Sequence, residues 1–271
     1  MLRVAAPTSA TEALAALGDP TVTATFGHGW EVAELPADLD PATVSVAPAP
    51  TTAPRLLVSD VDSTVILDEA IELLADRAGT RTEVAAVTER AMRGELDFAA
   101  SLAERVATLA GLPVSVFADV AQAVRPTPGL TELLASATAG NCPVVLVSGG
   151  FHEILAHLTP GWGIPPQNVH ANRLEVVDGR LTGRTRGPVI DRQAKADHLR
   201  THAAAIGVTA RQAVAVGDGA NDLAMIDAAG LGLAFCAKPV VAAAADGHIS
   251  HRRLDVVAWL SGLPLPAEDN E

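Results

Sequence analysis

The sequence is poor in cysteine. Only two of its 271 residues are cysteines, Cys142 and Cys236, and they lie far apart in the chain. Neither belongs to the paired spacing that is typical of cysteine metal ligands. The sequence therefore indicates neither an oxidised, secreted scaffold nor a cysteine-ligated metal site.

A long apolar run is also absent from the sequence. The first residues, Met1 to Thr8, lack the continuous apolar stretch of a signal peptide. No segment approaches the length of about 20 apolar residues that a membrane span needs. We therefore expect a cytoplasmic protein that has no membrane partner.

Positive charge is in deficit. The chain has 19 lysines and arginines against 32 aspartates and glutamates, which gives a net charge of −13. This charge argues against a nucleic-acid partner and leaves no basic patch for a membrane surface. It would also repel a small anionic substrate, so such a substrate needs local positive charge, for which Arg105 and Lys195 are the candidates.

Apolar residues, in contrast, are abundant. They make up 49% of the chain, which is enough for a substantial core. The length fits one large domain or two ordinary ones, and the oligomeric state is left open.

A short amino-terminal segment, residues 1–54, ends in a stretch that predicts a linker. Residues 46–54 are rich in proline, alanine and threonine. Before them, alternating residues 21–26 and 30–35 flank a glycine turn and predict a β-hairpin. A helix is predicted over residues 12–17.

The rest of the chain predicts βαβ units interrupted by a helical insertion. Apolar residues at helical spacing fill residues 67–124, where glycines and prolines divide about four helices. The flanking residues 55–66 and 125–262 form the predicted core, and residues 263–271 a flexible tail. Within the core, strands are predicted over 143–148, 213–216 and 231–235, helices over 192–206 and 222–229, and a hairpin over 173–182 with its turn at Asp178 and Gly179.

Acidic side chains follow two of the predicted strands. Asp60 and Asp62 come directly after residues 56–59, and Asp218 and Asp222 come after residues 214–216. Because ligands of open α/β sheets bind beyond the carboxyl ends of the strands, we expect both groups at one place. Crowded carboxylates need a cation, and hard oxygen ligands favour Mg²⁺.

A calcium loop is the alternative to weigh. Counted from Asp60, the sixth position is Val65 where that loop needs glycine, and the twelfth is Ile71 where it needs glutamate. Counted from Asp218, the same positions are Leu223 and Ala229. Neither segment therefore fits a calcium loop of this kind.

The first acidic pair suits phosphoryl transfer. Asp60 and Asp62 lie two residues apart, so an extended backbone points both side chains to one side of the sheet. A carboxylate can attack phosphorus and form an aspartyl phosphate. A second carboxylic acid can protonate the leaving oxygen and later deprotonate a water.

Several further residues could hold the phosphoryl group. Ser148 and the amide of Gly149 follow a buried strand and can donate hydrogen bonds, although a plain strand-to-helix turn has the same pattern. Lys195 would ordinarily be a solvated lysine. It gains a functional role if Asp218 binds the metal and Asp222, which sits behind Asp218, orients the lysine. Asn221 offers a donor and an acceptor beside them.

Taken together, these residues resemble the four motifs of the haloacid-dehalogenase-like phosphatases. The matching positions are 60–64, 148–150, Lys195 and 217–222. Further stretches narrow the resemblance to the members of that family that act on phosphoserine, and they are residues 88–98, 101–106, 172–175 and 229–232.

The resemblance implies a fold, a reaction and a set of roles. The fold is a Rossmann-like parallel sheet core with a small inserted helical cap, and the reaction is Mg²⁺-dependent hydrolysis of L-phosphoserine to L-serine and phosphate, the last step of serine biosynthesis. Asp60 would be nucleophile and metal ligand, and Asp62 would be the acid/base and bind Mg²⁺ through its backbone carbonyl. Asp218 would be the other metal ligand. The phosphoryl group would contact Ser148, Gly149, Lys195 and Asn221.

In the cap, the resemblance implies that Glu69 contacts the ammonium group of the substrate and that Arg105 contacts its carboxylate. Met92 and Phe98 would form an apolar cover. From the residues alone, Arg105 could equally be a rim residue beside an apolar helix stripe, and Glu69 a favourable charge at a helix start. The same chemistry on another small phosphomonoester, phosphoryl transfer to an alcohol, and a noncatalytic binding module are the other functions to test.

Overall fold

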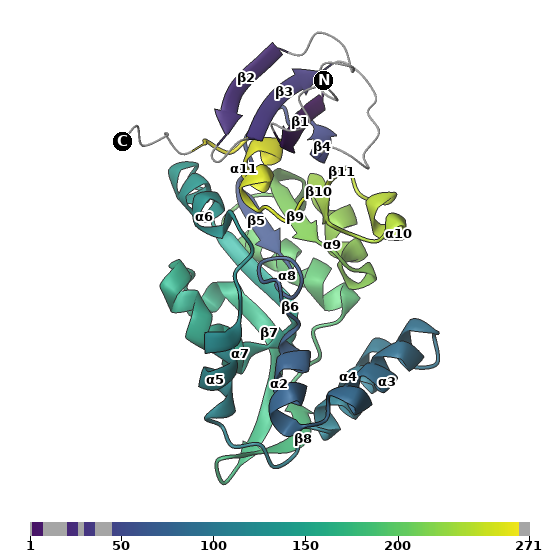
Figure 1. Ribbon diagram of the computed structural model, residues 1–271. Coiled ribbons are helices and arrows are strands. Elements are labelled where there is room, and N and C mark those ends of the chain that lie inside the picture. Colours follow the sequence, from purple (N-terminus) through teal and green to yellow (C-terminus); the bar gives the residue numbers. More distant parts are fainter. Residues whose placement is uncertain (1, 8–20, 27–29, 36–44, 266–271) are drawn as a thin grey trace. The chain divides into compact units, whose positions relative to one another are not determined.

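The computed structural model describes residues 2–7, 21–26, 30–35 and 45–265 (Figure 1). The helix predicted over residues 12–17 and most of the predicted tail lie outside these ranges. The chain has the α/β fold that the sequence predicts, with helices inserted between the first strand of the core and the next.

The chain divides into two compact units. The first comprises residues 1–59, 127–144 and 196–271, and the second comprises residues 60–126 and 145–195. The second unit thus contains the helices of the predicted cap together with the strands β6 to β8. The domain boundaries predicted from the sequence stay a prediction.

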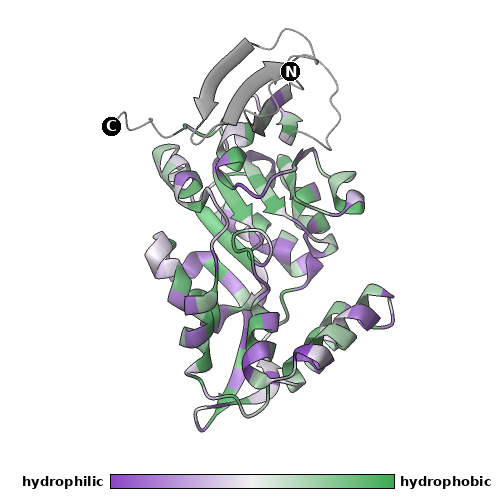
Figure 2. Ribbon diagram, viewed as in Figure 1, coloured by the Kyte–Doolittle hydropathy of each residue, from purple (hydrophilic) through white to green (hydrophobic). Residues whose placement is uncertain are grey.

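The first unit is built on a sheet with a parallel half and an antiparallel half. In spatial order its strands are β2 (Thr21–Phe26), β3 (Trp30–Leu35), β1 (Leu2–Pro7), β4 (Ser45–Pro48), β11 (Gly247–Ile249), β10 (Leu231–Phe235), β9 (Ala213–Gly217) and β5 (Leu56–Ser59). The last four are parallel. Every residue of β5, β9 and β10 is buried, as expected for parallel strands that are covered on both faces. Figure 2 shows that these strands are mainly hydrophobic.

The amino-terminal segment forms the antiparallel half. The predicted hairpin is present as β2 and β3, and β1 pairs with β3 and β4. β4 lies at residues 45–48, where the sequence predicted the start of a linker. It forms because its backbone pairs with β1 on one side and, at Val46, with His248 of β11 on the other.

The helices of this unit follow the predicted alternation with strands. They are α6 (Leu130–Ala139), α9 (Leu223–Ala228), α10 (Pro239–Ala242) and α11 (Asp255–Ser261), with 3-10 turns η4 (Ala210–Gln212) and η5 (Ala220–Asp222), and α8 (Arg192–Ala205), whose residues 192–195 still belong to the second unit. α8 and α9 begin and end within one residue of the predicted limits.

The second unit contains the four predicted helices and a smaller group of strands. Its elements are α2 (Ala70–Ala78), α3 (Arg81–Met92), α4 (Phe98–Ala107), α5 (Val116–Ala123), β6 (Val144–Phe151), α7 (His152–Leu158), η2 (Thr159–Trp162), η3 (Pro166–Asn168), β7 (Val169–Val177) and β8 (Arg180–Arg186). β6 and β7 are parallel, and β7 and β8 form the predicted hairpin. Its turn residues Asp178 and Gly179 both have positive φ, 49° and 73°, as a two-residue turn requires.

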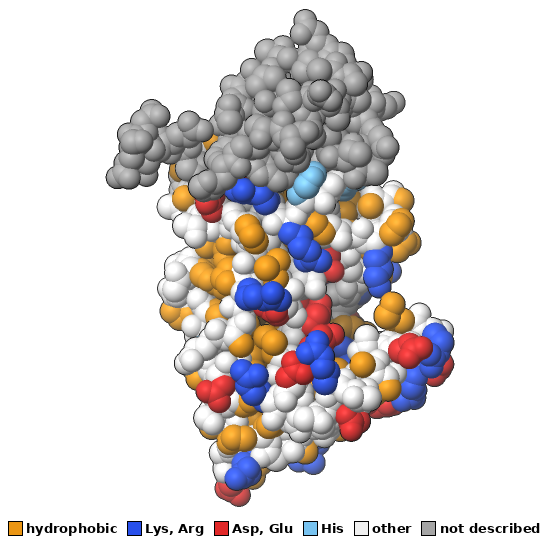
Figure 3. Space-filling view, in the orientation of Figure 1, with side chains coloured by type: hydrophobic (Ala, Val, Ile, Leu, Met, Phe, Trp, Pro, Cys, Tyr) orange, Lys and Arg blue, Asp and Glu red, His pale blue; other side chains and the backbone are white. Residues whose placement is uncertain are grey.

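Local chemistry sets the limits of the inserted helices. α2 ends at Gly79, whose φ of 70° is the left-handed conformation that terminates helices. α4 begins after Asp97, whose carboxylate accepts a hydrogen bond of 2.7 Å from the amide of Ala100. The outer faces of α3 and α4 carry interspersed acidic and basic side chains, including the ion pair between Arg90 and Glu104 (Figure 3).

Candidate active site

Asp60 is the first residue after β5, and it is held by a buried lysine. Its side chain is almost fully buried, and its Oδ1 lies 2.7 Å from Nζ of Lys195. Lys195 itself is completely buried in the first turn of α8. A lysine is rarely buried unless it is paired, so the structure removes the reading of Lys195 as an ordinary solvated residue.

The strands that deliver the two acidic groups are neighbours. β5 and β9 are parallel, and Ser59 lies opposite Val216. The chain therefore leaves both strands at the same edge of the sheet, into Asp60 from one and through Gly217 into Asp218 from the other. This register is the physical basis for the predicted convergence of carboxylates.

The loop after β9 is folded tightly on itself. Asp222 is completely buried, and its Oδ2 accepts a hydrogen bond of 2.9 Å from the amide of Gly219. A Cβ at Gly217 would lie 2.4 Å from Cγ of Asp222, so no larger residue fits there. Asp218 and Asn221 are half-buried on this loop.

Among the residues that the structure describes, the carboxylates of Asp60, Asp218 and Asp222 form a group that could bind a metal ion. Such hard oxygen donors fit Mg²⁺, Ca²⁺ or Mn²⁺ rather than a soft metal. The donor chemistry therefore fits the ion that the sequence predicts.

The glycine turn lies within β6, at Gly149 and Gly150, and it holds the other predicted catalytic carboxylate. Ser148 is completely buried, and its Oγ accepts a hydrogen bond of 2.8 Å from the amide of Gly150. A Cβ at Gly150 would lie 2.7 Å from Oδ2 of Asp62. Only a glycine at this position leaves room for the Asp62 carboxylate in its present place.

A cap residue lies over this turn. A Cβ at Gly149 would lie 3.2 Å from Cζ of Phe98, the first residue of α4. Phe98 thus lies close to Gly149, and its role as an apolar cover of the substrate stays a prediction. Met92, at the end of α3, has 70% of its surface exposed, so its predicted contact with the substrate stays a prediction.

The two charged cap residues lie within electrostatic reach of each other. Burial lowers the pKa of Arg105, while the negative charges of Glu69, Asp62 and Glu72 act in the opposite direction. The guanidinium, which stays protonated as arginines do in proteins, lies half-buried near these acids. Its Nε donates to the carbonyl of Ser101 in its own helix, at 3.2 Å.

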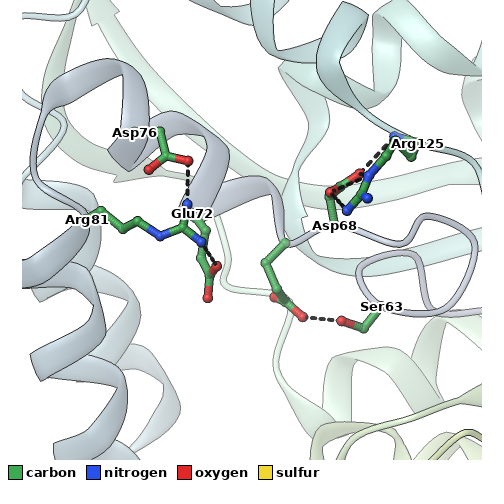
Figure 4. A network of polar contacts seen from close by, with 7 residues as sticks. Ser63, Asp68, Glu72, Asp76, Arg81 and Arg125 are labelled. Carbon is green, nitrogen blue, oxygen red and sulfur yellow. Dashed lines mark hydrogen bonds and ion pairs between the residues drawn. The ribbon is translucent and has the colours of Figure 1, made fainter.

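Glu69 is oriented by a residue to which the sequence assigned no role. The hydroxyl of Ser63 donates a hydrogen bond of 2.7 Å to Oε1 of Glu69 (Figure 4). Ser63 has a φ of 57°, a left-handed conformation that is uncommon outside glycine and that turns its side chain back towards Glu69. A positive φ in a serine has no reliable sequence signal, which is why this partner was not predicted.

The chain enters the inserted helices near Leu67 and leaves them near Arg125, and hydrogen bonds connect these two segments. The amide of Leu67 donates to the carbonyl of Arg125 at 2.9 Å. The guanidinium of Arg125 binds Asp68, with its Nη2 2.6 Å from Oδ1, and its backbone amide donates to Oδ2 at 2.8 Å (Figure 4). Figure 4 also shows Arg81 of α3 bound to Glu72 and Asp76 of α2. These pairs connect the helices of the insertion to one another and to its base.

Comparison with known proteins places this site in a family. Residues 57–227 match the haloacid dehalogenase-like hydrolases, and the chain belongs to that family. Within it, the chain is similar to phosphoserine phosphatases. It is 51% identical over 209 residues to phosphoserine phosphatase SerB2 of Mycobacterium tuberculosis, a match that covers 77% of this chain and 51% of the relative. It is 47% identical over 199 residues to the phosphoserine phosphatase of Lactococcus lactis, with 73% of this chain and 91% of the relative covered.

The chain therefore spans about half the length of the Mycobacterium tuberculosis protein. A solved structure described as a phospho-aspartyl intermediate analogue of phosphoserine phosphatase superposes with a TM-score of 0.70 at 37% identity, covering 76% of this chain and 98% of that one. Separately, none of the helices in the described ranges is long and apolar enough to cross a bilayer.

Proposed function

We propose that this chain is a Mg²⁺-dependent phosphatase that hydrolyses L-phosphoserine to L-serine and phosphate. The observation that carries the proposal is the completely buried Lys195 paired with Asp60 at the end of β5. A cation buried against a strand-end carboxylate has no evident packing role, but it suits a site where phosphoryl charge must be neutralised. The names of the relatives support the choice of substrate.

The reaction proceeds in two displacements at phosphorus. An oxygen of Asp60 attacks the phosphoryl group to form an aspartyl phosphate, and the serine oxygen leaves with a proton from Asp62. Asp62 then takes a proton from a water, which attacks the same phosphorus, releases phosphate and restores Asp60. The solved structure of a phospho-aspartyl intermediate analogue in a similar protein supports this route.

The metal ligands in this proposal are the carboxylates of Asp60 and Asp218 and the backbone carbonyl of Asp62. Mg²⁺ would supply positive charge that offsets the repulsion between the attacking carboxylate and the phosphoryl oxygens. Asp222 supports the loop of Asp218 through its bond to Gly219, and we retain its predicted role in orienting Lys195.

Opposite charges in the cap select a zwitterionic substrate. Glu69 binds the ammonium group of phosphoserine and Arg105 binds its carboxylate, while Phe98 and Met92 cover them. At the other end, the phosphoryl oxygens bind Ser148, Gly149, Lys195 and Asn221. The electrostatic influence of Glu69 on Arg105 supports the presence of two opposite charges near each other in the cap.

Phosphate release from a panel of phosphoamino acids and other small phosphomonoesters tests the proposal. We expect L-phosphoserine to be hydrolysed fastest, activity to disappear in excess chelator, and Mg²⁺ to restore it. Preference for a substrate without an amino-acid end, or phosphate recovered on an added alcohol instead of in water, would contradict it. The proposed reaction completes serine biosynthesis, and we expect it in the cytoplasm.

The variant Asp60→Asn tests the nucleophile. The amide is nearly isosteric but cannot form the acyl phosphate, so we expect no steady-state turnover. Because the substitution removes the charge partner of buried Lys195, circular dichroism must first show that the variant is folded. Turnover by a folded variant free of wild-type enzyme would mean that water attacks phosphorus directly.

A further inference from the structure

A bulge in the ladder between β6 and β7 creates the glycine turn. Ser148 lies opposite Ala171, but the next paired residue of β6 is Phe151, which lies opposite Asn172. Gly149 and Gly150 therefore bulge out of this ladder and have no paired residue in β7. A backbone carbonyl in such a place needs a replacement partner if it is not to be left unsatisfied.

The side chain of Asn172 supplies that partner. Asn172 is almost completely buried, and its Nδ2 donates a hydrogen bond of 2.8 Å to the carbonyl of Gly149. The same peptide is held at its other end, because the amide of Gly150 donates to Oγ of Ser148 at 2.8 Å. The peptide plane between the two glycines is thus fixed from both sides.

Asn172 also fixes a second part of the site. Its Oδ1 accepts a hydrogen bond of 2.8 Å from the amide of Ile190, two residues before α8 begins. The first turn of α8 carries Lys195. One buried amide therefore connects the glycine turn to the segment that leads to the phosphoryl-binding lysine.

The orientation of this peptide determines where catalytic groups lie. The Asp62 carboxylate lies against Cα of Gly150, and the ring of Phe98 lies against Gly149. If the peptide rotated, the surface that Asp62 contacts and the direction of the neighbouring donors would both change. Small displacements of this kind are costly for a reaction that depends on positioning.

We propose that Asn172 is a positioning residue of the phosphoryl-binding turn, acting through Gly149 on the donors and on Asp62. This inference rests on the proposed phosphatase function and names a residue outside its four motifs. Asn172 touches neither the substrate nor the metal in this scheme. Its contribution is confined to the phosphoryl end of the site and does not extend to the cap charges that select serine.

Two variants of similar size test the proposal. Asn172→Asp replaces the donor to Gly149 with an oxygen but keeps an acceptor for Ile190, and Asn172→Leu removes both bonds without adding charge. We expect kcat to fall by roughly 10²-fold in both. The loss should be equal for phosphoserine and p-nitrophenyl phosphate, because both present the same phosphoryl group. The inhibition constant of orthovanadate should rise in parallel.

The inhibition constant separates positioning from mere stability, because it does not depend on how much of the sample is folded. Thr159→Val is the matched control, since it removes a buried hydroxyl that donates to the carbonyl of Leu155 at 2.9 Å, away from the turn. We expect that control to lower Tm and leave the inhibition constant unchanged. If both Asn172 variants behaved like the control, Asn172 would be structural and the proposal would be overturned.

The experiment also distinguishes this proposal from the choice of substrate. If the wild-type protein hydrolysed p-nitrophenyl phosphate but not phosphoserine, the proposed substrate would be wrong. The comparison of the Asn172 variants on p-nitrophenyl phosphate would still decide whether Asn172 positions the turn. If it hydrolysed neither, calorimetric binding of orthovanadate with Mg²⁺ would provide the comparison. A wild-type protein that did not bind orthovanadate would show that the turn is not a phosphoryl site, and the inference would fall.

Discussion

The guanidinium of Arg105 separates the specific substrate from the general chemistry. It lies in the inserted helix α4, outside all the motifs that contact phosphate, and it faces acids in a desolvated place. Arg105→Ala removes a charge-assisted hydrogen bond worth about 1.5–3 kcal/mol. We therefore expect kcat/KM for phosphoserine to fall by roughly 10- to 150-fold. Hydrolysis of p-nitrophenyl phosphate, which has no carboxylate, should lose much less. Equal losses on both substrates would make Arg105 a structural or cap-closing residue.

Gly150 offers a test of the acid/base that does not alter the carboxylate itself. In Gly150→Ala the new Cβ would lie 2.7 Å from Oδ2 of Asp62, and the end of that side chain can move away without unfolding the protein. General acid–base catalysis contributes roughly 10²- to 10⁴-fold, so we expect a loss in this range. The phosphoenzyme should then accumulate from p-nitrophenyl phosphate, seen as a burst of p-nitrophenol.

Gly161→Ala provides the control for this experiment, because its Cβ meets nothing within 4 Å. A Gly150→Ala variant with normal turnover and no burst would show that Asp62 does not need its present position.

For single residues, the sequence predicts chemical roles better than it predicts the contacts that hold each side chain in place. The burial of Lys195 and its pairing with Asp60 suit the role that the family resemblance implies for this lysine, and that role stays a prediction. The partners Ser63 and Asn172 could not be predicted in the same way. Their roles depend on a left-handed backbone and on a strand bulge, which arise from tertiary pairing and not from local sequence pattern.

Among the elements, the base of the insertion gives a prediction about pH. Burial raises the pKa of Asp68, but the side-chain and backbone hydrogen bonds from Arg125 and its charge outweigh this and hold that pKa below its usual value. A carboxyl group whose pKa is lower in the folded state stabilises the fold at pH values above its unfolded pKa of about 3.9. This stabilisation is lost as the pH falls through the folded-state pKa. We therefore expect Asp68→Asn to lower Tm at neutral pH, and the difference from wild type to shrink below about pH 4.

Asp119→Asn, which removes an exposed charge from α5, is the matched control for this titration. Its Tm difference from wild type should stay small at every pH. A Tm difference for Asp68→Asn that persisted unchanged in acid would show that the pair with Arg125 does not stabilise the folded state.

Elements with a strong periodic signal were predicted well, and those that depend on partners were not. The four helices of the insertion and the hairpin of β7 and β8 carry their own signals in glycine stops and turn residues. β4 does not, because its four residues include a proline and read as part of a linker. It becomes a strand only through its neighbours β1 and β11.

At the scale of the whole molecule, the amino-terminal segment belongs to the first compact unit through particular contacts. Ala47 of β4 is buried against Gly247 of β11, and the hydroxyl of Ser45 accepts from the amide of Ser250 at 3.1 Å. Arg3 of β1 donates to the carbonyl of Trp259 at 2.8 Å and lies over its ring. Removing this segment would uncover the edge of β11, which is unfavourable for a sheet.

Gly247→Ala tests this attachment without deleting any residue. The new Cβ would lie 2.5 Å from Cβ of Ala47 and 2.7 Å from the backbone carbonyl of Val46, so β4 must move away from β11. Overpacking of this kind costs roughly 1–3 kcal/mol, so we expect a lower Tm and faster proteolytic cleavage within residues 1–54. Turnover per folded molecule should stay near that of wild type, because the residues assigned to catalysis begin at Asp60.

Gly161→Ala again serves as the control. Unchanged Tm and cleavage would mean that the segment is not held through β4, whereas a loss of turnover in a folded variant would mean that this edge of the sheet supports the site as well.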